Sequence, residues 1–298
     1  MAPSKMPAAV RGVLWMATAG IAFTFMTVLI RPAAEEMHPL QIVFLRNLLG
    51  VIIMLPFVAR VIEFRIWRSP NFRLHLLRAT LTAIAMGCWF TAIPHIALSE
   101  AVALNFTTPL FVTVMAVVVL KETIRVRRLS AIAMGFVGVL IVVRPGFSQL
   151  QFEQVLLLLD ALFWGVAIIL IRILSRTESP QTIVAYMFIL ILPISAVPAV
   201  FVWSWPSVTA WWLIAGVAVS STVGHYCSTK AFTVAEASVI MPFDYMRLVW
   251  FTAAGFLAFG EIPDHWTLVG GGVIAGSSLY LLLREHALAK QNRRQGQN

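Results

Sequence analysis

The sequence predicts an all-α polytopic membrane protein with ten transmembrane helices, arranged as two inverted five-helix repeats. Of its 298 residues, 60% are hydrophobic and only 12% are charged, whereas about a quarter of the residues in soluble domains are charged. Apolar runs fill most of the chain, and about 20 such residues form a helix that crosses a bilayer. Features of the first half also return in the second at a nearly constant distance, which indicates an internal repeat.

The repeat is clearest where the first apolar span of each half ends. Both spans finish on the pair Ile-Arg, at Arg31 and at Arg172. Eight residues later each copy has a proline, Pro39 and Pro180. Both pairs are 141 residues apart (172 minus 31, and 180 minus 39). A constant offset over two landmarks is typical of a duplicated unit rather than of chance similarity.

Ten segments have the length and composition of membrane-spanning helices. In chain order these are 11–30, 39–59, 74–93, 98–120, 127–144, 153–172, 181–203, 209–230, 236–259 and 266–284. The predicted domains are the five-helix repeats 11–146 and 152–285, followed by a polar tail, 286–298, which we expect to be disordered and cytoplasmic. We expect prolines within spans, such as Pro109 and Pro242, to kink or interrupt them.

The distribution of basic residues orients the spans. With ten spans, eighteen of the 22 Lys and Arg residues fall on the side that holds both termini, and two, Arg31 and Arg144, fall on the other side. Basic loops stay in the cytoplasm, so the count places both termini there, in a multi-pass protein of a bacterial-type inner (cell) membrane. Five spans per half is an odd number, and the second half is therefore predicted to be inverted relative to the first.

The last span of each half is rich in small residues. These are Gly135 and Gly138 in the first half, and Gly270, Gly271, Gly272, Ala275 and Gly276 in the second. Small residues allow close helix approach within lipid, where no hydrophobic force drives packing. We expect these two spans to form a static wall of the protein, or alternatively the face of a homodimer.

Two stretches carry a resemblance to a known family. The run "PLFVTVMAVVVLKE" precedes a basic turn and a small-residue helix, and "MPFDYMRLVWFTAAGFLAFGE" precedes the glycine-rich last span. The chain resembles the EamA-type branch of the drug/metabolite transporter superfamily. That resemblance implies a secondary transporter without a cofactor, whose central cavity between the halves is lined mainly by spans 1, 3, 4, 6, 8 and 9. "LRATLTAIAMGCWFTAI" and "PFDYMRL" resemble uptake-type members, which implies a riboflavin-like vitamin, an S-adenosylmethionine-like compound or an amino acid as substrate.

Ionisable residues inside spans mark the candidate site, because each costs at least about 2.5 to 3.5 kcal/mol at the bilayer centre. Asp244 and Arg247 lie three residues apart and therefore on one helical face. They form either a structural ion pair or a charge pair that binds a polar substrate, and the neighbouring proline favours a site. Asn105 and Thr108 occupy the corresponding place in the first half, so the substrate is expected where the two regions meet.

Two further charged residues have alternative interpretations. Arg46 is either a structural ion pair or gate, pairing with Asp160 or Asp244, or a residue that snorkels to the outer headgroups. Asp160 is either a proton-coupling carboxylate or a buried packing acid. His225 titrates near neutral pH, so the proton-coupling candidates are Asp160, His225 and Asp244.

Aromatic residues near these charges form a candidate substrate wall. They are Trp89, Phe90, Trp164, Tyr226 and Tyr245, next to His225. Such a wall suits a flat or cationic metabolite through ring stacking and cation–π attraction. Glu261, in contrast, ends an apolar run, and we expect it to have a structural role through basic neighbours.

Other function classes fit the sequence less well. A membrane-embedded enzyme needs convergent nucleophile and base or metal ligands, and HExxH, GxSxG and a companion for His225 are absent from the sequence. A channel needs polar residues repeated along a span, and a receptor or structural protein has no evident use for inverted halves. The net charge of +9 reflects cytoplasmic loops, so no nucleic-acid partner and no metal are expected. The expected partners are a small-molecule substrate and the lipid bilayer.

Overall fold

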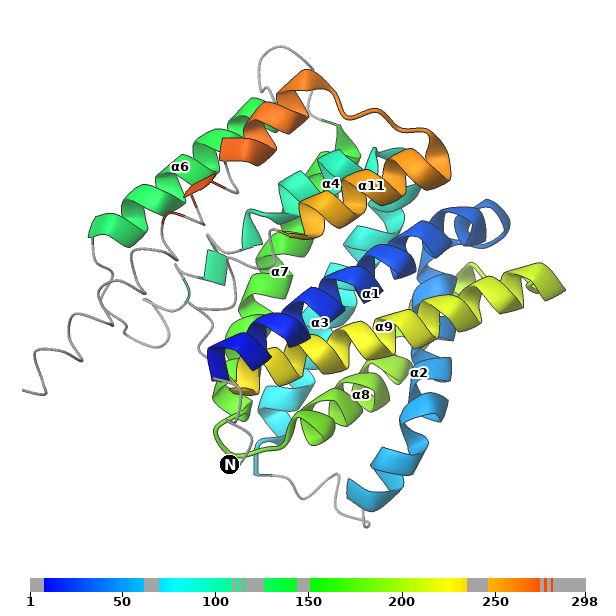
Figure 1. Cartoon of the computed structure of the whole chain (residues 1–298). Coiled ribbons are helices and arrows are strands. Elements are labelled where there is room, and N and C mark those ends of the chain that lie inside the picture. Colours follow the sequence, from blue (N-terminus) through cyan, green and yellow to red (C-terminus); the bar gives the residue numbers. More distant parts are fainter. Residues whose placement is uncertain are drawn as a thin grey trace, which may run out of the picture.

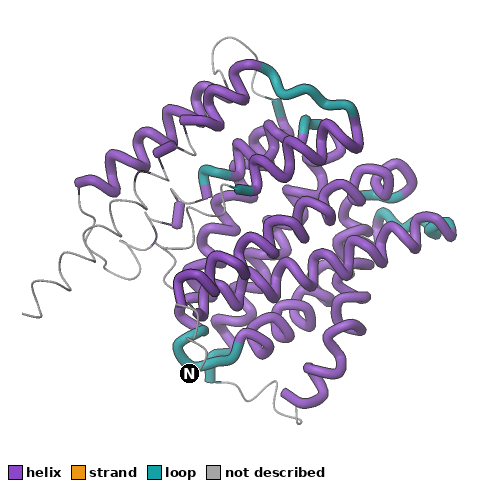
Figure 2. Tube along the Cα trace, viewed as in Figure 1, coloured by secondary structure: helices purple, strands orange, loops and turns teal. Residues whose placement is uncertain are grey.

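The computed structural model describes residues 8–61, 70–108, 111–112, 115, 126–143, 151–234, 246–273, 276–277 and 280. This part of the chain consists of helices and connecting loops and contains no strand (Figure 2). Six of the described helices are long and apolar enough to cross a membrane. The prediction of an all-α polytopic membrane protein is therefore confirmed, and the count of ten spans in two inverted halves stays a prediction.

Figure 1 shows the arrangement of the helices, which we divide into a first half (residues 8–143) and a second half (residues 151–280). The first half contains α1 (Ala8–Glu36), α2 (Pro39–Val61), α3 (Phe72–Ala92), the short 3₁₀ helix η2 (Ile93–His95), α4 (Leu98–Asn105) and α6 (Val126–Val143). The second half contains α7 (Phe152–Leu174), α8 (Pro180–Phe201), α9 (Val208–Val234) and α11 (Arg247–Phe259), followed by helical residues 265–273. The predicted tail 286–298 lies outside the described residues.

The repeated prolines begin matching helices. Pro39 opens α2 and Pro180 opens α8, a position that proline favours because its missing N–H has no helical partner there. Ser179 caps α8 by accepting a hydrogen bond from the backbone N–H of Thr182 at 3.2 Å. At the far end of α11, Gly260 adopts the left-handed conformation (φ +67°) that ends many helices. Local sequence therefore sets these helix boundaries.

The predicted span 98–120 is not a continuous helix. α4 ends at Asn105, and Phe106 and Thr107 form a turn. The hydroxyl of Thr107 donates to the carbonyl of Leu104 at 2.8 Å. The turn lies two to three residues before Pro109, and Thr108 is again helical, so the break is not at the one residue whose geometry proline restricts directly. The interruption predicted from this proline thus falls on Phe106 and Thr107, next to Asn105.

Helices of the first half pack against helices of the second. α1 lies along α9, α3 along α7, α2 along α8, and α4 against α11 (Figure 1). In the predicted repeat α1 corresponds to α7, α3 to α9 and α2 to α8. Exchange of the two halves therefore converts the α1–α9 pair into the α7–α3 pair and leaves α2 paired with α8. The packing is compatible with a two-fold relation between the halves, which stays a prediction. It also leaves the central space bounded by both halves.

A glycine permits the close packing of α1 against α9. A Cβ atom added at Gly224 would lie 2.7 Å from the ring of Phe23, closer than real Cβ contacts come. Gly216, two turns earlier on α9, faces Leu29 in the same way. Because a phenyl ring is stiffer than the tip of a leucine, Gly224 is the tighter of the two positions.

Gly224→Ala is expected to destabilise the protein by about 1 to 3 kcal/mol, because the added methyl group overpacks the α1–α9 contact. The measurement is the thermal unfolding midpoint of the purified protein in detergent. Gly272→Ala is the matched control, since no described atom outside its own helix backbone and chain neighbours lies within 4 Å of a Cβ at that position. Equal midpoints for the two variants would contradict the assigned contact.

The glycine-rich spans meet one another in the structure. α6 and the last described helical residues run side by side (Figure 1), and a Cβ at Gly135 would lie 3.7 Å from Oγ of Ser277. Small residues at the crossing agree with the predicted close approach of these two helices. Met134 and Phe136 on α6 are exposed, and the homodimer face stays a prediction. Ala275 lies outside the described residues.

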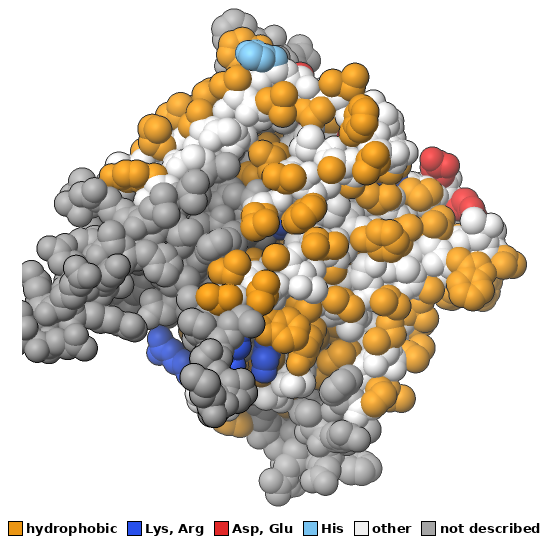
Figure 3. All heavy atoms as spheres, in the orientation of Figure 1, with side chains coloured by type: hydrophobic (Ala, Val, Ile, Leu, Met, Phe, Trp, Pro, Cys, Tyr) orange, Lys and Arg blue, Asp and Glu red, His pale blue; other side chains and the backbone are white. Residues whose placement is uncertain are grey.

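The surface has the character of a protein embedded in lipid. On the face in Figure 3, hydrophobic side chains cover the described surface, Lys and Arg gather at the end near the N-terminus, and Asp and Glu lie toward the opposite end. An apolar band between charged ends matches a hydrocarbon layer between two polar interfaces. Arg78 departs from this pattern. The charge count assigns it to the cytoplasmic side, but within α3 it is only 1% exposed.

Candidate functional site

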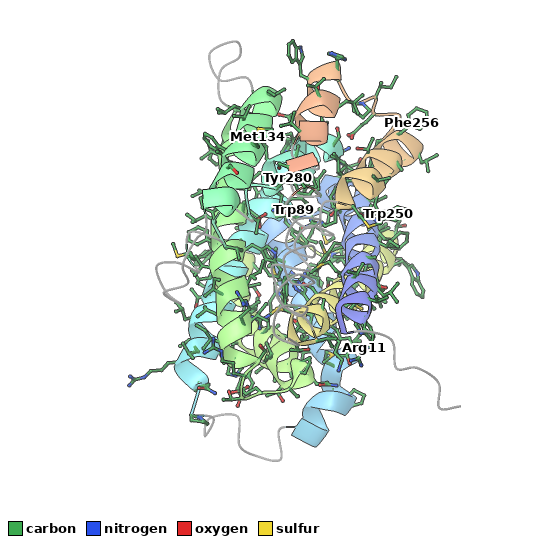
Figure 4. The ribbon with its side chains drawn as sticks, turned by 60° about the vertical axis from the view of Figure 1, so that its left-hand side comes forward. Arg11, Trp89, Met134, Trp250, Phe256 and Tyr280 are labelled. Atoms are coloured by element: carbon green, nitrogen blue, oxygen red, sulfur yellow. The ribbon has the colours of Figure 1, made fainter. Side chains whose placement is uncertain are left out.

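A cavity lies between helices of both halves. Its lining comes from α1, α2, α3 and α4 of the first half and from α7, α9 and α11 of the second. The residues are Phe23, Met26, Thr27, Arg46, Ala85, Met86, Trp89, Phe90, Asn105, Asp160, Trp164, His225 and Arg247. These helices are the six spans that the family resemblance implied, with α2 in addition. Figure 4 shows Trp89 near the middle of the molecule and Phe256 toward its edge.

A hydrogen-bonded chain of three polar residues crosses the cavity. Nη1 of Arg247 donates to Oδ1 of Asn105 at 3.4 Å, and Nδ2 of Asn105 donates to Oδ2 of Asp160 at 2.6 Å. All three side chains are buried. Asn105 belongs to the first half, and the two charged residues belong to the second. The uncharged residue of one half therefore connects a cation and an anion of the other, at the break that follows α4.

Arg46 is fully buried, with an exposed fraction of 0%. Its Nη2 donates to Oδ1 of Asn47 at 2.9 Å and to the sulfur of Met86 at 3.1 Å. The rings of Phe90 and Phe188 each lie 5.8 Å from the guanidinium carbon. The predicted ion pair with Asp160 is absent from the described residues, and a head group with no exposed surface does not snorkel to the headgroups.

Aromatic rings surround His225. Its ring makes edge contacts with Phe23, Trp164 and Phe188, at centroid distances of 5.1, 5.6 and 6.3 Å. Trp89, which also lines the cavity, packs edge-on against Phe251 at 6.1 Å. Edge-to-face pairs of this kind hold rings in fixed orientations. The cavity therefore presents rigid aromatic surfaces next to charged groups.

The structure brings most of the predicted site residues together. Trp89, Phe90, Asn105, Asp160, Trp164, His225, Arg247 and Arg46 all line the cavity. Tyr226 does not: it packs edge-on against Trp15 at 6.1 Å and its hydroxyl faces Gln181 at 3.4 Å. Consecutive helical residues point about 100° apart, so Tyr226 follows His225 away from the cavity.

The remaining predicted residues lie elsewhere or cannot be placed. Thr108 is buried but is not part of the cavity lining. Its carbonyl lies 3.4 Å from a Cβ added at Gly165, so this segment packs against α7. Asp244 and Tyr245 lie outside the described residues, and the predicted pair of Asp244 with Arg247 is therefore not described. Thr108 thus belongs to the packing around the helix break.

Sequence reasoning missed five lining residues. They are Phe23, Met26, Thr27, Ala85 and Met86. Each stands in a membrane span where apolar and small side chains are ordinary, so residue type alone carries no signal. For Phe23, the presence of Gly224 on α9 is informative only once the packing of α9 against α1 is known.

An ion pair links the halves beyond one end of α3. Arg31 of α1 pairs with Glu261, which follows α11, and Arg31 also donates to the carbonyls of Ile93 and Ile96. Glu261 accepts a second hydrogen bond from the backbone N–H of Leu98 at 2.9 Å. The predicted structural role of Glu261 fits this contact. Its partner comes from the first half rather than from its own loop.

A second polar contact links the halves at the other end of α3. Nε2 of His75 lies 2.6 Å from Oε2 of Glu178, in the connection between α7 and α8. The His75 ring also stacks on Tyr186 at 4.0 Å with an interplanar angle of 14°. Asn71 donates to the other oxygen of Glu178 at 3.1 Å. Contacts between the halves therefore lie at both ends of α3, with the cavity between them.

Comparison with known proteins places this arrangement in context. The model of the EamA-like transporter family matches residues 10–144 and 151–283. The chain is 29% identical over 287 residues to a riboflavin transporter of Vibrio cholerae, covering 95% of this chain and 96% of that one. It is 25% identical over 274 residues to an S-adenosylmethionine uptake transporter of Rickettsia prowazekii, covering 92% and 93%.

Two further comparisons extend the range of relatives. The chain is 29% identical over 275 residues to a pseudopaline exporter of Pseudomonas aeruginosa, covering 91% of this chain and 95% of the exporter. A solved crystal structure superposes with a TM-score of 0.67 at 15% identity, covering 91% of this chain and 98% of the other. At that identity the likeness concerns the fold alone.

Proposed function

This chain belongs to the EamA-like transporter family, a small-molecule transporter family, and we propose that it is a secondary transporter that moves a small polar metabolite by alternating access. The observation that carries the proposal is the cavity, which both halves line and which holds the buried residues Arg46, Asp160, His225 and Arg247. Charged residues are costly inside a membrane and mark substrate or ion pathways. A site formed where two halves meet is typical of transporters that rock one half against the other.

The lining supports the proposed substrate class. Rigid rings such as Trp89 and Trp164 suit a flat or ring-containing molecule, and the charged and amide groups suit its polar substituents. The substrates named for the relatives, riboflavin, S-adenosylmethionine and pseudopaline, guide the choice of compounds. We propose a vitamin such as riboflavin, an S-adenosylmethionine-like compound or an amino acid. The relatives' names include both uptake and export, and an alternating cavity serves either direction.

The contacts at the two ends of α3 support a rocking motion. Access from one side requires separation of the halves at the Arg31–Glu261 pair, and access from the other requires separation at His75–Glu178. If the halves move as rigid bodies, the two contacts open in turn. We further propose that the protein lies in the inner membrane with both termini in the cytoplasm, as the distribution of Lys and Arg predicts.

The function is tested with purified protein in proteoliposomes. A thermal-shift screen against riboflavin, S-adenosylmethionine, amino acids, nucleosides and quaternary amines selects compounds that stabilise the protein, because a bound ligand shifts the unfolding equilibrium. Counterflow of each stabilising compound then separates a transporter from a receptor. Binding without counterflow, for every stabilising compound, would overturn the proposal.

Trp164→Ala is expected to weaken binding of the compound identified in that screen by about three- to tenfold, because an aromatic surface contributes roughly 0.5 to 1.5 kcal/mol beyond its buried area. Titration of the purified variant measures the dissociation constant. Trp212→Ala is the matched control, since Trp212 is 76% exposed and does not line the cavity. An unchanged affinity in Trp164→Ala would remove this residue from the proposed site.

A further inference from the structure

The cavity contains more positive than negative groups among its described lining residues. Arg46 and Arg247 are the cations and Asp160 is the anion, and His225 carries no formal charge when neutral. The single carboxylate already accepts the hydrogen bond of Asn105, which itself accepts one from Arg247. One arginine of the lining is thus linked to the carboxylate, and Arg46 is not part of that chain.

The contacts of Arg46 leave its charge without a neutralising partner in the described part of the chain. Among the described residues, Arg31 forms an ion pair with Glu261 and His75 contacts the carboxylate of Glu178, and neither contact includes Arg46. Its hydrogen bonds go to an amide oxygen and to a thioether sulfur, and sulfur is a weak acceptor. Its Nε is buried and has no acceptor. A buried guanidinium in this state is unfavourable unless another acceptor completes its surroundings.

A second buried donor on the same cavity also has no partner. Nε1 of Trp89 makes no hydrogen bond and is shielded from solvent. An indole N–H only donates, and a guanidinium only donates. Two unsatisfied donor groups on one cavity wall fit a ligand that supplies acceptor oxygens. A planar guanidinium is especially suited to the paired oxygens of a carboxylate or a phosphate.

We propose that Arg46 binds an oxyanion of the transported molecule, a carboxylate or a phosphate, while the rest of that molecule packs against Trp89, Phe90 and Trp164. The proposal rests on the proposed transport function and specifies its substrate class as ring-containing organic acids. Bound substrate then neutralises the cavity, and the aromatic rings beside Arg46 exclude water from the ion pair, which strengthens it. An uncharged analogue leaves Arg46 unsatisfied.

Arg78 is a matched control within the same protein. It is 1% exposed, its Nε also has no acceptor, and it contacts a methionine sulfur. Its Nη1, however, donates to the backbone carbonyl of Ile183 at 2.9 Å, and Arg78 does not line the cavity. Neutralising either arginine removes one buried charge, but only the change at Arg46 removes it from the cavity.

The test uses two pairs of probes whose members share a ring system and differ in charge. Indole-3-acetate and indole-3-acetamide form the carboxylate pair, and riboflavin 5′-phosphate and riboflavin form the phosphate pair. Binding is measured by calorimetry on purified wild type, Arg46→Gln, Arg46→Lys and Arg78→Gln. In the wild type we expect the anion of at least one pair to bind about tenfold tighter than its neutral partner, as charge-assisted hydrogen bonds allow.

The variants then show which arginine causes the preference for the anionic probe. We expect Arg46→Gln to bind both members equally, Arg46→Lys to keep part of the preference, and Arg78→Gln to keep all of it. If Arg46→Gln does not fold, the comparison of Arg46→Lys with Arg78→Gln decides. Equal or tighter binding of the neutral member in both wild-type pairs overturns the inference. An anion preference that is undiminished in Arg46→Gln, or that is lost in Arg78→Gln, also overturns it.

Counterflow separates this inference from the function on which it rests. Counterflow of a neutral compound with no anion preference leaves the transport function standing and overturns the oxyanion site. Tight binding of the anion without counterflow of any compound overturns the transport function and leaves the oxyanion site standing. A wild-type protein that binds none of the probes or the compounds of the thermal-shift screen overturns both.

Discussion

Asp160→Leu is expected to reduce counterflow about a hundredfold. The change leaves Nδ2 of Asn105 without its acceptor at 2.6 Å and removes the one carboxylate of the described cavity lining. Leaving a buried donor unsatisfied, next to unbalanced charge, costs about 3 kcal/mol, and each 1.4 kcal/mol is roughly a factor of ten. Counterflow in proteoliposomes, at matched amounts of folded protein, measures the loss.

Asp160→Asn separates the hydrogen bond from the charge. Its amide oxygen still accepts from Asn105, so we expect counterflow to fall much less than in Asp160→Leu. Uphill uptake driven by a pH gradient needs a group that exchanges a proton, and Asp160 and His225 are the titratable residues of the described lining other than arginine. If Asp160 is the coupling group, Asp160→Asn retains counterflow and loses pH-driven accumulation. If Asp160→Asn retains both counterflow and pH-driven accumulation, Asp160 is not the coupling group.

Glu153→Leu is the control for the first of these changes. Glu153 lies in the first turn of α7, on the same helix as Asp160, but it does not line the cavity. Because Glu153 is half-buried and lies away from the cavity lining, its removal is expected to change counterflow by less than about twofold. Wild-type counterflow in Asp160→Leu would mean that the Asn105–Asp160 contact has no part in transport.

Charge was the feature of the sequence that predicted the site best. Asp160, His225 and Arg247 stand out because ionisable residues are rare in membrane spans, and all three line one cavity. Phe23 and Met26 line it equally but are indistinguishable, in sequence, from side chains that face lipid. In a membrane protein both the lipid and the interior are apolar, so hydrophobic periodicity does not separate the two faces.

Contacts between distant residues were the part that sequence could not predict. The first span was expected to end near residue 30, yet α1 continues to Glu36. Arg31 remains within the helix because Glu261 and two backbone carbonyls surround its side chain. None of these partners lies nearby in sequence. The contact of His75 with Glu178 was missed for the same reason, since it joins α3 to a loop 103 residues later.

The helix interruption at the end of α4 was predicted from the sequence only in part. Pro109 predicted a break in its span, but the turn itself falls at Phe106 and Thr107. The position of the break matters because Asn105 is the last residue of α4 and carries the contact to Asp160. Proline restricts the residue before it, and tertiary packing against α7 decides how far back the helix ends.

Glu261→Ala is expected to lower the stability of the protein by about 2 kcal/mol or more. The change leaves Arg31 without its carboxylate, in a site where the two side chains are only 14% and 21% exposed. It also removes the acceptor of the backbone N–H of Leu98. Breaking a buried pair by removing one partner costs about 3 to 5 kcal/mol, and partial exposure reduces that figure through solvent screening. The thermal unfolding midpoint in detergent measures the effect.

A double-mutant cycle separates the ion pair from the other contacts of the two residues. In Arg31→Met combined with Glu261→Ala, neither charge is left unpaired, so the combined loss is expected to be smaller than the sum of the single losses. Glu36→Ala, an exposed carboxylate at the end of the same helix, is the control and is expected to change the midpoint little. Additive losses would show that Arg31 and Glu261 act independently.

The same pair joins the halves at one end of α3, so the variants should shift the protein toward the state that is open at that end. We expect this shift to raise the labelling of a cysteine placed at Thr27 by a membrane-impermeant thiol reagent that is added from the Arg31 side. Unchanged labelling in a protein with a lowered midpoint would restrict the pair to stabilising the fold.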